Sequence, residues 1–233
     1  MSELWTVHLG EIEYREAYAL QERVRAARQA DLIPDTLLLL EHPPVYTRGR
    51  RSEPGELVRG EDWYRDQGLD IVDVDRGGFL TYHGPGQLVG YPIMRVAGLR
   101  EFVGTMERAI VAALDEEGVP GARGRSEEAP EVIGAWIEER KIASIGVHRA
   151  RGVTTHGFAV NVDNDLAPFG WVVACGMPEV HMTSIERETG RGGQMPCFRK
   201  RMAFAFAETF GRRQRLVSLA RLEAAIDAAP VPA

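Results

Sequence analysis

Two residue types in this 233-residue chain stand out for the chemistry that they could do: a cysteine and a lysine. Cys175 follows an apolar run over residues 171–174 and precedes Gly176, which suits a side chain presented at the end of a strand. Most free cysteines are small buried residues, and Cys197, in a helical pattern, fits that description. A thiol becomes a nucleophile near pH 7 only where a cation or base lowers its pKa from about 8.5. The candidates for that neighbour are Lys141 and the histidines.

Lysine is rare in this chain. Of its 28 basic residues, only Lys141 and Lys200 are lysines, so arginine supplies nearly every positive charge. A guanidinium keeps its proton in proteins, whereas a buried ammonium gives it up more readily. A lysine in such a chain is therefore a candidate for proton transfer. Lys200 lies in a basic run over residues 199–201 and is expected on the surface.

The glycine-rich segment over residues 76–91 is the second feature with chemical potential. Its five glycines indicate a backbone that approaches a ligand closely or adopts positive φ angles. The segment matches no phosphate-binding loop, because it lacks both Gly-Lys-Ser/Thr and the third glycine of a dinucleotide-binding turn. With Arg76, Thr81, His83 and Gln87 as polar groups, it is either the wall of a substrate site or a tight turn between strands.

The spacing of the histidines does not favour a metal site. Those considered as ligands are His42, His83, His148, His156 and His181. No two of them are three or four positions apart, and no H-E-x-x-H occurs, so a zinc site with Cys175 has little support. The chain also lacks the Gly-x-Ser-x-Gly of a serine hydrolase. We therefore expect no metal site.

Hydrophobic periodicity predicts the elements that must position these residues. Strands are expected over residues 5–9, 36–40, 70–75, 132–137, 141–147 and 153–162. Helices are expected over residues 14–29, 102–114, 197–210 and 218–226. Since the strands occur in runs with helices between the runs, we expect an α+β fold with a mixed, largely antiparallel sheet flanked by helices. Residues 132–147 form a predicted hairpin, with residues 153–162 beside it.

Length and composition narrow the class of protein. We expect one domain over residues 1–233, which could include a small C-terminal helical lobe from about Met195. Apolar runs such as residues 37–40 are far shorter than the ~18 residues that span a membrane. The net charge of −6 argues against a nucleic-acid partner. Two cysteines and an N-terminus without a signal-like segment favour the cytoplasm.

The chain resembles the lipoyl(octanoyl) transferases of lipoate biosynthesis over nearly its whole length. The blocks that carry the resemblance are LLLEHPPVYT (38–47), RGGFLTYHGPGQLVGYP (76–92), KIASIGV (141–147), THGFAVNV (155–162), CG (175–176) and TS (183–184). That family is similar in fold to the catalytic domains of biotin and lipoate protein ligases.

The resemblance implies a reaction and its partners. An octanoyl group would pass from octanoyl-acyl carrier protein, through a thioester on Cys175, to a lysine of a lipoyl domain. The acceptors would be lipoyl domains of 2-oxoacid dehydrogenases and the glycine cleavage H protein. Lys141 would lower the pKa of Cys175, and no cofactor would be needed, because thioester exchange is close to energy-neutral. The backbone N–H of Gly176 and His83 are candidate donors to the oxyanion.

The resemblance also implies a substrate wall. Its residues would be Arg76, Gly77, Gly78, Phe79, Leu80, Thr81, Tyr82, His83, Ser144, Ile145, Gly146, Gly157, Phe158 and Ala159. Six methylenes of an octanoyl tail contribute roughly 0.8 kcal/mol each when buried, which predicts a narrow apolar slot bordered by the glycine-rich segment and Phe158.

Docking of the donor raises a question of charge, since acyl carrier proteins are acidic and this chain is acidic overall. A local basic patch is therefore expected, with Arg48, Arg50, Arg51, Arg149 and Arg151 as candidates.

Three other interpretations of the function stay open at this point. The chain could be an ATP-dependent lipoate or biotin ligase, a non-catalytic acyl- or lipoyl-binding module, or a cysteine hydrolase that releases free acid.

Overall fold

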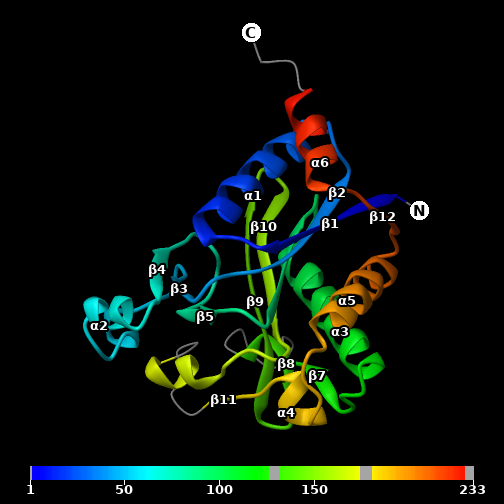
Figure 1. Ribbon diagram of the computed structural model, residues 1–233. Coiled ribbons are helices and arrows are strands. Elements are labelled where there is room, and N and C mark those ends of the chain that lie inside the picture. Colours follow the sequence, from blue (N-terminus) through cyan, green and yellow to red (C-terminus); the bar gives the residue numbers. More distant parts are fainter. Residues whose placement is uncertain (1, 126–131, 174–179, 229–233) are drawn as a thin grey trace.

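The computed structural model describes residues 2–125, 132–173 and 180–228, and it has the α+β architecture expected from the sequence (Figure 1). Within these residues the larger sheet has nine strands in the order β12-β1-β2-β6-β10-β9-β8-β7, with β11 paired to β9. Its strands are β1 (Glu3–Glu11), β2 (Asp35–Glu41), β6 (Gln87–Ile93), β7 (Ala122–Gly124), β8 (Gly134–Ile137), β9 (Arg140–Ala150), β10 (Val153–Asn161), β11 (His181–Met182) and β12 (Arg213–Leu216). β1 is parallel to β2 and β12, β11 is parallel to β9, and the other pairs are antiparallel. The prediction of a mixed, largely antiparallel sheet is confirmed.

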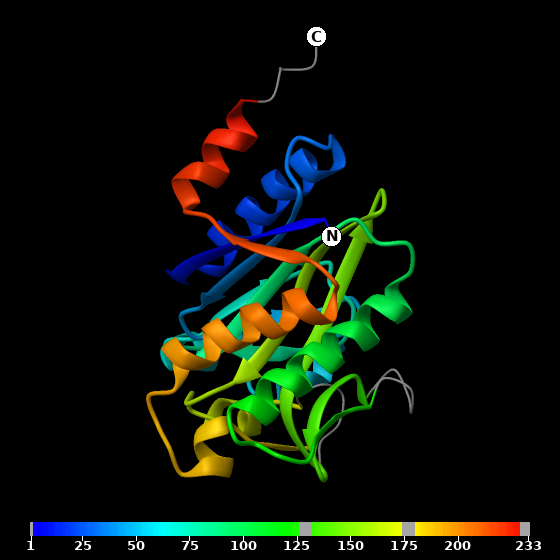
Figure 2. The ribbon, with the colours of Figure 1, turned by 90° about the vertical axis from the view of Figure 1, so that its right-hand side faces the viewer.

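Helices cover both faces of this sheet (Figures 1 and 2). On one face α3 (Leu99–Glu116) and α5 (Met195–Thr209) lie side by side. On the other face lies α1 (Tyr14–Gln29), which contacts β6, β10 and α6 (Leu219–Asp227). The shorter helices are α2 (Glu61–Asp66), α4 (Ile185–Thr189) and the 3-10 turns η1 (Pro54–Glu56) and η3 (Ala167–Trp171). The four helices predicted from the sequence correspond to α1, α3, α5 and α6.

The leucine run in β2 shows why the sheet is covered twice. Leu37 and Leu39 pack into the cluster under α3 and α5, whereas Leu38 and Leu40 pack into the cluster under α1. Successive side chains of a strand point to opposite faces, so a strand that is covered on both sides is apolar throughout. Each of the four is fully buried, which contributes about 1.5–3 kcal/mol per side chain.

A second, smaller sheet contains part of the glycine-rich segment, whose last residues belong to β6 of the larger sheet. In the order β4-β3-β5, it consists of β4 (Asp70–Asp73), β3 (Val45–Arg48) and β5 (Thr81–His83). The sequence predicted the strand at β4 but not β3, β5 or β6. These three strands lie in segments rich in Gly and Pro, whose composition indicates turns, and tertiary packing overrides that preference here.

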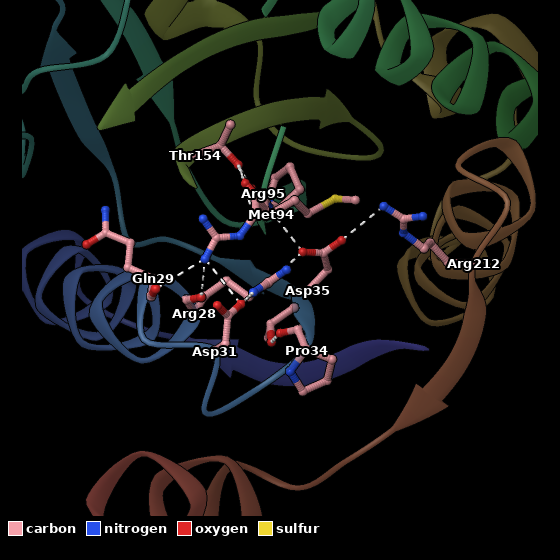
Figure 3. Close-up of polar contacts among 11 residues, drawn as sticks. Arg28, Gln29, Asp31, Pro34, Asp35, Met94, Arg95, Thr154 and Arg212 are labelled. Atoms are coloured by element: carbon pink, nitrogen blue, oxygen red, sulfur yellow. Dashed lines mark hydrogen bonds and ion pairs between the residues drawn. The ribbon is translucent and has the colours of Figure 1, made fainter. Parts of the chain in front are cut away.

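An ion-paired network fixes the end of β2 that is remote from the glycine-rich segment (Figure 3). Asp35, which is 6% exposed, accepts from Arg28 Nε at 2.8 Å and from Arg212 Nη2 at 3.1 Å. It also accepts the backbone N–H of Arg95 at 3.1 Å. A buried carboxylate is tolerated only when it is paired and hydrogen-bonded. The network therefore joins α1, β2, the end of β6 and the segment after α5.

The C-terminal helices share the core of the rest of the chain. Phe198, Met202 and Phe206 of α5 belong to the same hydrophobic cluster as Met106 and Ile110 of α3.

In the described part of the chain, no helix combines the length and apolar character that a membrane span requires.

Candidate active site

A cavity of about 380 Å³ lies between the glycine-rich segment, β9, β10 and the first turns of α3. Twelve of the fourteen residues expected in a substrate wall line it: Arg76, Gly77, Gly78, Phe79, Thr81, His83, Ser144, Ile145, Gly146, Gly157, Phe158 and Ala159. The other two, Leu80 and Tyr82, belong instead to the hydrophobic cluster that contains Tyr46 and Tyr64. Alternation explains the difference for β5, because Thr81 and His83 face the cavity and Tyr82 between them faces away.

Lys141 is part of the cavity wall and is only 3% exposed. Its Nζ lies 5.1 Å from the centroid of the Trp136 ring, within range of a cation–π contact. The other lysine, Lys200, is exposed on α5, as expected. A long cationic side chain is rarely buried without a role or a partner. Lys141 is buried and Lys200 is exposed, as the scarcity of lysine and the basic run around Lys200 suggested.

A β-bulge determines where Lys141 points. In the pairing of β8 with β9, Ala135 is opposite Ala143 and Trp136 is opposite Lys141, so one residue of β9 is extra. Lys141 and Ser144 are three positions apart and would face opposite sides of a regular strand, yet both line the cavity. Bulges commonly redirect a side chain beside an active site.

Cys175, the candidate nucleophile, lies outside the described residues, as does Gly176. The chain that follows it is described from Val180 onward and pairs at once with the strand that carries Lys141. Met182 of β11 is opposite Lys141 of β9, and the N–H of Thr183 donates to the carbonyl oxygen of Lys141 at 3.0 Å.

The exposure of Cys197 differs from what the sequence predicts. This residue is exposed, so the prediction of a buried small residue is wrong. It lies in the first turn of α5, next to Phe198, which is fully buried. The helix therefore places Phe198 in the core and leaves the preceding cysteine on the solvent side.

Arg76 holds the glycine-rich wall in shape. Its guanidinium donates to the carbonyl oxygen of Thr47 at 2.6 Å and to Thr47 Oγ1 at 2.7 Å. It also donates to the carbonyl oxygens of Phe79 at 2.8 Å and Gly77 at 3.1 Å. Bonds to several carbonyl groups of one turn fix the path of the backbone. The sequence predicted Arg76 as a polar group of the wall, and the structure shows it bracing that wall from within.

Close approach explains one of the glycines beside the cavity. A Cβ atom on Gly90 would lie 2.1 Å from Cζ of Phe158, so the bare backbone of β6 gives the ring room to lie against it. Phe158 belongs to the same cluster as Val103 of α3. Together with Ile133 and Ile145, these two residues form what we call the apolar wall.

Tyr14, His83, Tyr91 and His156 also line the cavity, and we call them the polar wall. The rings of Tyr14 and His83 are stacked, with centroids 6.1 Å apart. Tyr14 Oη lies 3.3 Å from His156 Nδ1. His156 adopts a φ of 58°, unusual for a side-chain-bearing residue within a strand, and its N–H donates to Gln21 Oε1 at 2.7 Å.

The hydrogen bonds of His83 determine which ring nitrogen carries the proton. His83 Nδ1 lies 2.7 Å from Gln87 Oε1, while Gln87 Nε2 donates to the carbonyl oxygen of Tyr82 and to Asn161 Oδ1. A carbonyl only accepts, so the amide orientation is fixed and Nδ1 of His83 is the donor. Burial, assisted by the nearby His42, lowers the pKa of His83 well below its ordinary value. The neutral ring thus carries a lone pair at Nε2, which does not suit the predicted role of donor to an oxyanion.

His42 and Asp75 support the polar wall from behind. His42 Nδ1 lies 2.7 Å from the carbonyl oxygen of Ile12, so Nε2 accepts from the Tyr91 hydroxyl, also at 2.7 Å. Burial lowers the pKa of His42 to about 4. Asp75 accepts from His156 Nε2 at 2.7 Å, and this bond holds the pKa of Asp75 below its ordinary value. Burial lowers the pKa of His156 despite that partner.

Several cavity residues were not predicted from the sequence. They are Tyr14, Arg51, Tyr91, Leu99, Arg100, Val103, Ile133, Val147 and His156. Tyr91 and His156 lie in segments that carry the resemblance, which was a usable signal, and Arg51 was expected only as part of a docking patch. Nothing in the periodicity of α3 distinguishes Val103 from the other buried residues of its apolar face. Within the described ranges, no three His, Cys, Asp or Glu side chains are grouped so that they could hold a metal ion.

Comparison with known proteins places the chain in a family. The family described as the lipoyl protein ligase A/B catalytic domain matches residues 13–207. A protein named Octanoyltransferase from Dictyoglomus thermophilum is 40% identical over 200 residues, which cover 86% of this chain and 84% of that protein. A second protein of that name, from Acidothermus cellulolyticus, is 46% identical over 194 residues, which cover 79% and 81%.

A solved structure supports the same fold. It is described as an archaeal lipoylation system, a bi-partite lipoate protein ligase and its E2 lipoyl domain, from Thermoplasma acidophilum. It matches with a TM-score of 0.75 at 17% identity, covering 97% of this chain and 91% of that chain. At that identity the likeness shows the fold alone. On the extent of the family match and the identity to these relatives, the chain belongs to the lipoyl protein ligase A/B catalytic domain family.

Proposed function

We propose that this protein is an acyltransferase that moves an octanoyl group from octanoyl-acyl carrier protein, through a thioester on Cys175, to a lysine of a lipoyl domain. The relatives that align over most of their own length and of this chain are named Octanoyltransferase, which supports octanoyl as the transferred group. The observation that carries the proposal is a buried lysine in the wall of an apolar cavity. At about 380 Å³ the cavity falls within the range of about 300–1,000 Å³ that is usual for small-molecule sites.

The first half of the reaction is a thioester exchange. The sulfur of Cys175 attacks the carbonyl carbon of the donor thioester, the carbon–sulfur bond to the carrier breaks, and the carrier thiol leaves with a proton. Lys141 holds the thiolate as an ammonium or takes the thiol proton as an amine. The pairing of Met182 with Lys141 supports this assignment, because the chain shortly after Cys175 lies on the strand that carries the lysine.

The second half forms an amide. The amine of the acceptor lysine attacks the acyl carbon on Cys175, loses a proton, and releases the cysteine thiol. Lys141 is the group we assign to that proton, which arginine could not handle because it stays protonated. The backbone N–H of Gly176 remains the proposed donor to the oxyanion, and the tautomer of His83 leaves no second donor at its Nε2.

The alternative with a specific observation behind it is an ATP-dependent ligase, since the fold is that of a lipoate protein ligase. A ligase activates a free acid with ATP and needs no cysteine. The test is transfer from octanoyl-acyl carrier protein to a purified lipoyl domain without nucleotide, followed by the intact mass of the lipoyl domain. We expect octanoylation without ATP. A requirement for ATP and free octanoate would favour the ligase, and release of free octanoate without domain modification would favour a hydrolase.

We propose that the donor docks on a basic rim of the cavity formed by Arg51 and Arg100. Both side chains line the cavity and are exposed, and Arg51 lies 4.4 Å from the centroid of the Phe79 ring. Arg48, one of the expected docking residues, instead pairs with Glu61 at 2.6 Å and Asp73 at 2.7 Å. Its charge is therefore already compensated. Arg149 donates to the carbonyl oxygens of residues 96 and 97.

A salt titration tests the rim. Replacing Arg51 and Arg100 by Gln should weaken the dependence of transfer rate on ionic strength, because exposed charges act within a Debye length of about 8–10 Å. Arg48→Gln is the matched control and should leave that dependence unchanged. An unaltered salt dependence in the double variant would remove the rim from the docking surface.

Other parts of the proposal rest on the sequence. The acceptors are proposed to be lipoyl domains of 2-oxoacid dehydrogenases and the glycine cleavage H protein. A cytoplasmic location is proposed from the low cysteine content. We also propose that residues 1–233 form a single catalytic domain, which the shared core of α3 and α5 supports.

A further inference from the structure

A buried carboxylate on α3 lies outside the cavity lining and has no part in the reaction described above. Glu107 is 4% exposed and shares a helix face with Val103, Ile110 and Leu114, four before, three after and seven after it. A carboxylate is costly to bury and persists only where hydrogen bonds compensate it. Its place among apolar residues therefore calls for a reason.

One hydrogen-bond partner of Glu107, Gly134, lies against Lys141. Glu107 Oε1 accepts the buried backbone N–H of Gly134 at 2.9 Å. Gly134 opens β8 with a φ of 135°, a conformation that side-chain-bearing residues rarely adopt. A Cβ atom there would lie 3.0 Å from Cε of Lys141 and 2.2 Å from the carbonyl oxygen of Ala143. The backbone of Gly134 is thus packed against the carbon that bears the Lys141 amine.

We propose that Glu107 is a positioning residue that acts on Lys141 through Gly134. A hydrogen bond from a backbone N–H to a carboxylate is charge-assisted and strong, so it fixes the start of β8 relative to α3. That segment forms one side of the space in which the end of Lys141 lies. A shift of about 1 Å in a reacting group can cost about 100-fold in rate. The inference rests on the proposed role of Lys141.

The experiment compares Glu107→Leu, which removes the acceptor, with Glu107→Gln, which retains a carbonyl oxygen of the same reach. Glu117→Gln is the matched control, because Glu117 is also a buried carboxylate at the end of the same helix and pairs with Arg201 at 2.9 Å. All variants carry Cys197→Ser, which removes the exposed thiol. The measurements are kcat and KM for octanoyl transfer, the pH dependence of Cys175 alkylation by iodoacetamide, and thermal unfolding.

We expect Glu107→Leu to lower kcat by about 10- to 100-fold with KM changed less than about threefold. The midpoint pH of Cys175 alkylation should move upward in that variant, since the cation near the thiol is displaced. Glu107→Gln and Glu117→Gln should keep kcat within about threefold of the parent. If leucine prevents folding, Glu107→Asp, which retracts the carboxylate, makes the same comparison.

Two results overturn the inference alone. The first is a folded Glu107→Leu protein with unchanged kcat and alkylation profile, as a purely structural role would give. The second is an equal loss in Glu107→Gln, which would point to the charge and not to the position of Gly134. A fully active Lys141→Arg variant would overturn the proposed function and this inference together. Normal activity of Glu107→Leu beside an inactive Lys141→Arg overturns the inference alone.

Discussion

The two walls of the cavity are built differently. The polar wall of Tyr14, His83, Tyr91 and His156 is held by directional bonds between buried rings and by His42 and Asp75 behind it. The apolar wall of Val103, Ile133, Ile145 and Phe158 is held by packing in the cluster between the sheet and α3. Hydrogen-bonded rings respond to protons, and packed side chains respond to volume. The comparison indicates that pH and side-chain size can be used to perturb the two walls separately.

Removal of the proton-handling group should have the largest effect. Lys141→Arg keeps a positive charge and length but cannot release a proton, so we expect the rate of octanoyl transfer to fall by about 10²–10⁴. Lys200→Arg on the exposed face of α5 is the control and should have no effect. A Lys141→Arg enzyme with the parent rate would show that octanoyl transfer does not require proton transfer by Lys141.

The polar wall should lose stability in acid. Folding holds the pKa of His42 at about 4, against about 6.5 in the unfolded chain, so the unfolded state binds more protons between those values. The stabilising contribution is therefore present above pH 6.5 and is lost as the pH falls toward 4. Between pH 7 and pH 5 we expect about 2 kcal/mol less free energy of unfolding from this group.

Urea unfolding at the two pH values checks this expectation. His42→Gln should show a shallower pH dependence than the parent, whereas replacement of the exposed His181 by Gln should leave it unchanged. Equal slopes in the parent and His42→Gln would mean that the polar wall is indifferent to the protonation of this ring.

The apolar wall should set the length of the acyl chain. Val103→Phe adds volume to the cavity lining, and excluding two methylenes costs about 1.6 kcal/mol of burial. We expect the ratio of octanoyl to hexanoyl transfer rates to fall roughly 15-fold, with little change in hexanoyl transfer. Val111→Phe, a partly buried position of the same helix outside the cavity, should leave the ratio unchanged. An unaltered ratio in Val103→Phe would remove this residue from the chain-length limit.

The sequence predicts those parts of the fold and of the site that depend on local spacing or on the rarity of one residue type. The helices at α1, α3, α5 and α6 follow from apolar spacing, and the leucine run in β2 follows from its continuity. The scarcity of lysine made Lys141 a candidate, and the structure places it, buried, in the cavity wall. The glycines of the glycine-rich segment leave a substrate wall and a tight turn equally open, and only the resemblance to a family implies the wall.

The rest depends on contacts between segments far apart in the chain. Leu80 and Tyr82 were expected in the wall, but the alternation of β5 directs Tyr82 into another cluster. β6 contains Gly90 and Pro92, which weaken its strand pattern, yet it is a buried central strand, and the ring of Phe158 packs against its bare backbone at Gly90. The link from Glu107 to Lys141 joins positions that no local pattern relates.

The proposed reaction requires transient attachment of the acyl group to Cys175 with Lys141 beside it. The most direct measurement is the intact mass of the protein after mixing with octanoyl-acyl carrier protein in the absence of a lipoyl domain. We predict a hydroxylamine-sensitive octanoyl adduct on the parent and on Cys197→Ser, none on Cys175→Ser, and a large loss on Lys141→Arg. An adduct that persists on Cys175→Ser and vanishes on Cys197→Ser would contradict the account, as would octanoylation of lipoyl domains at the parent rate by Cys175→Ser.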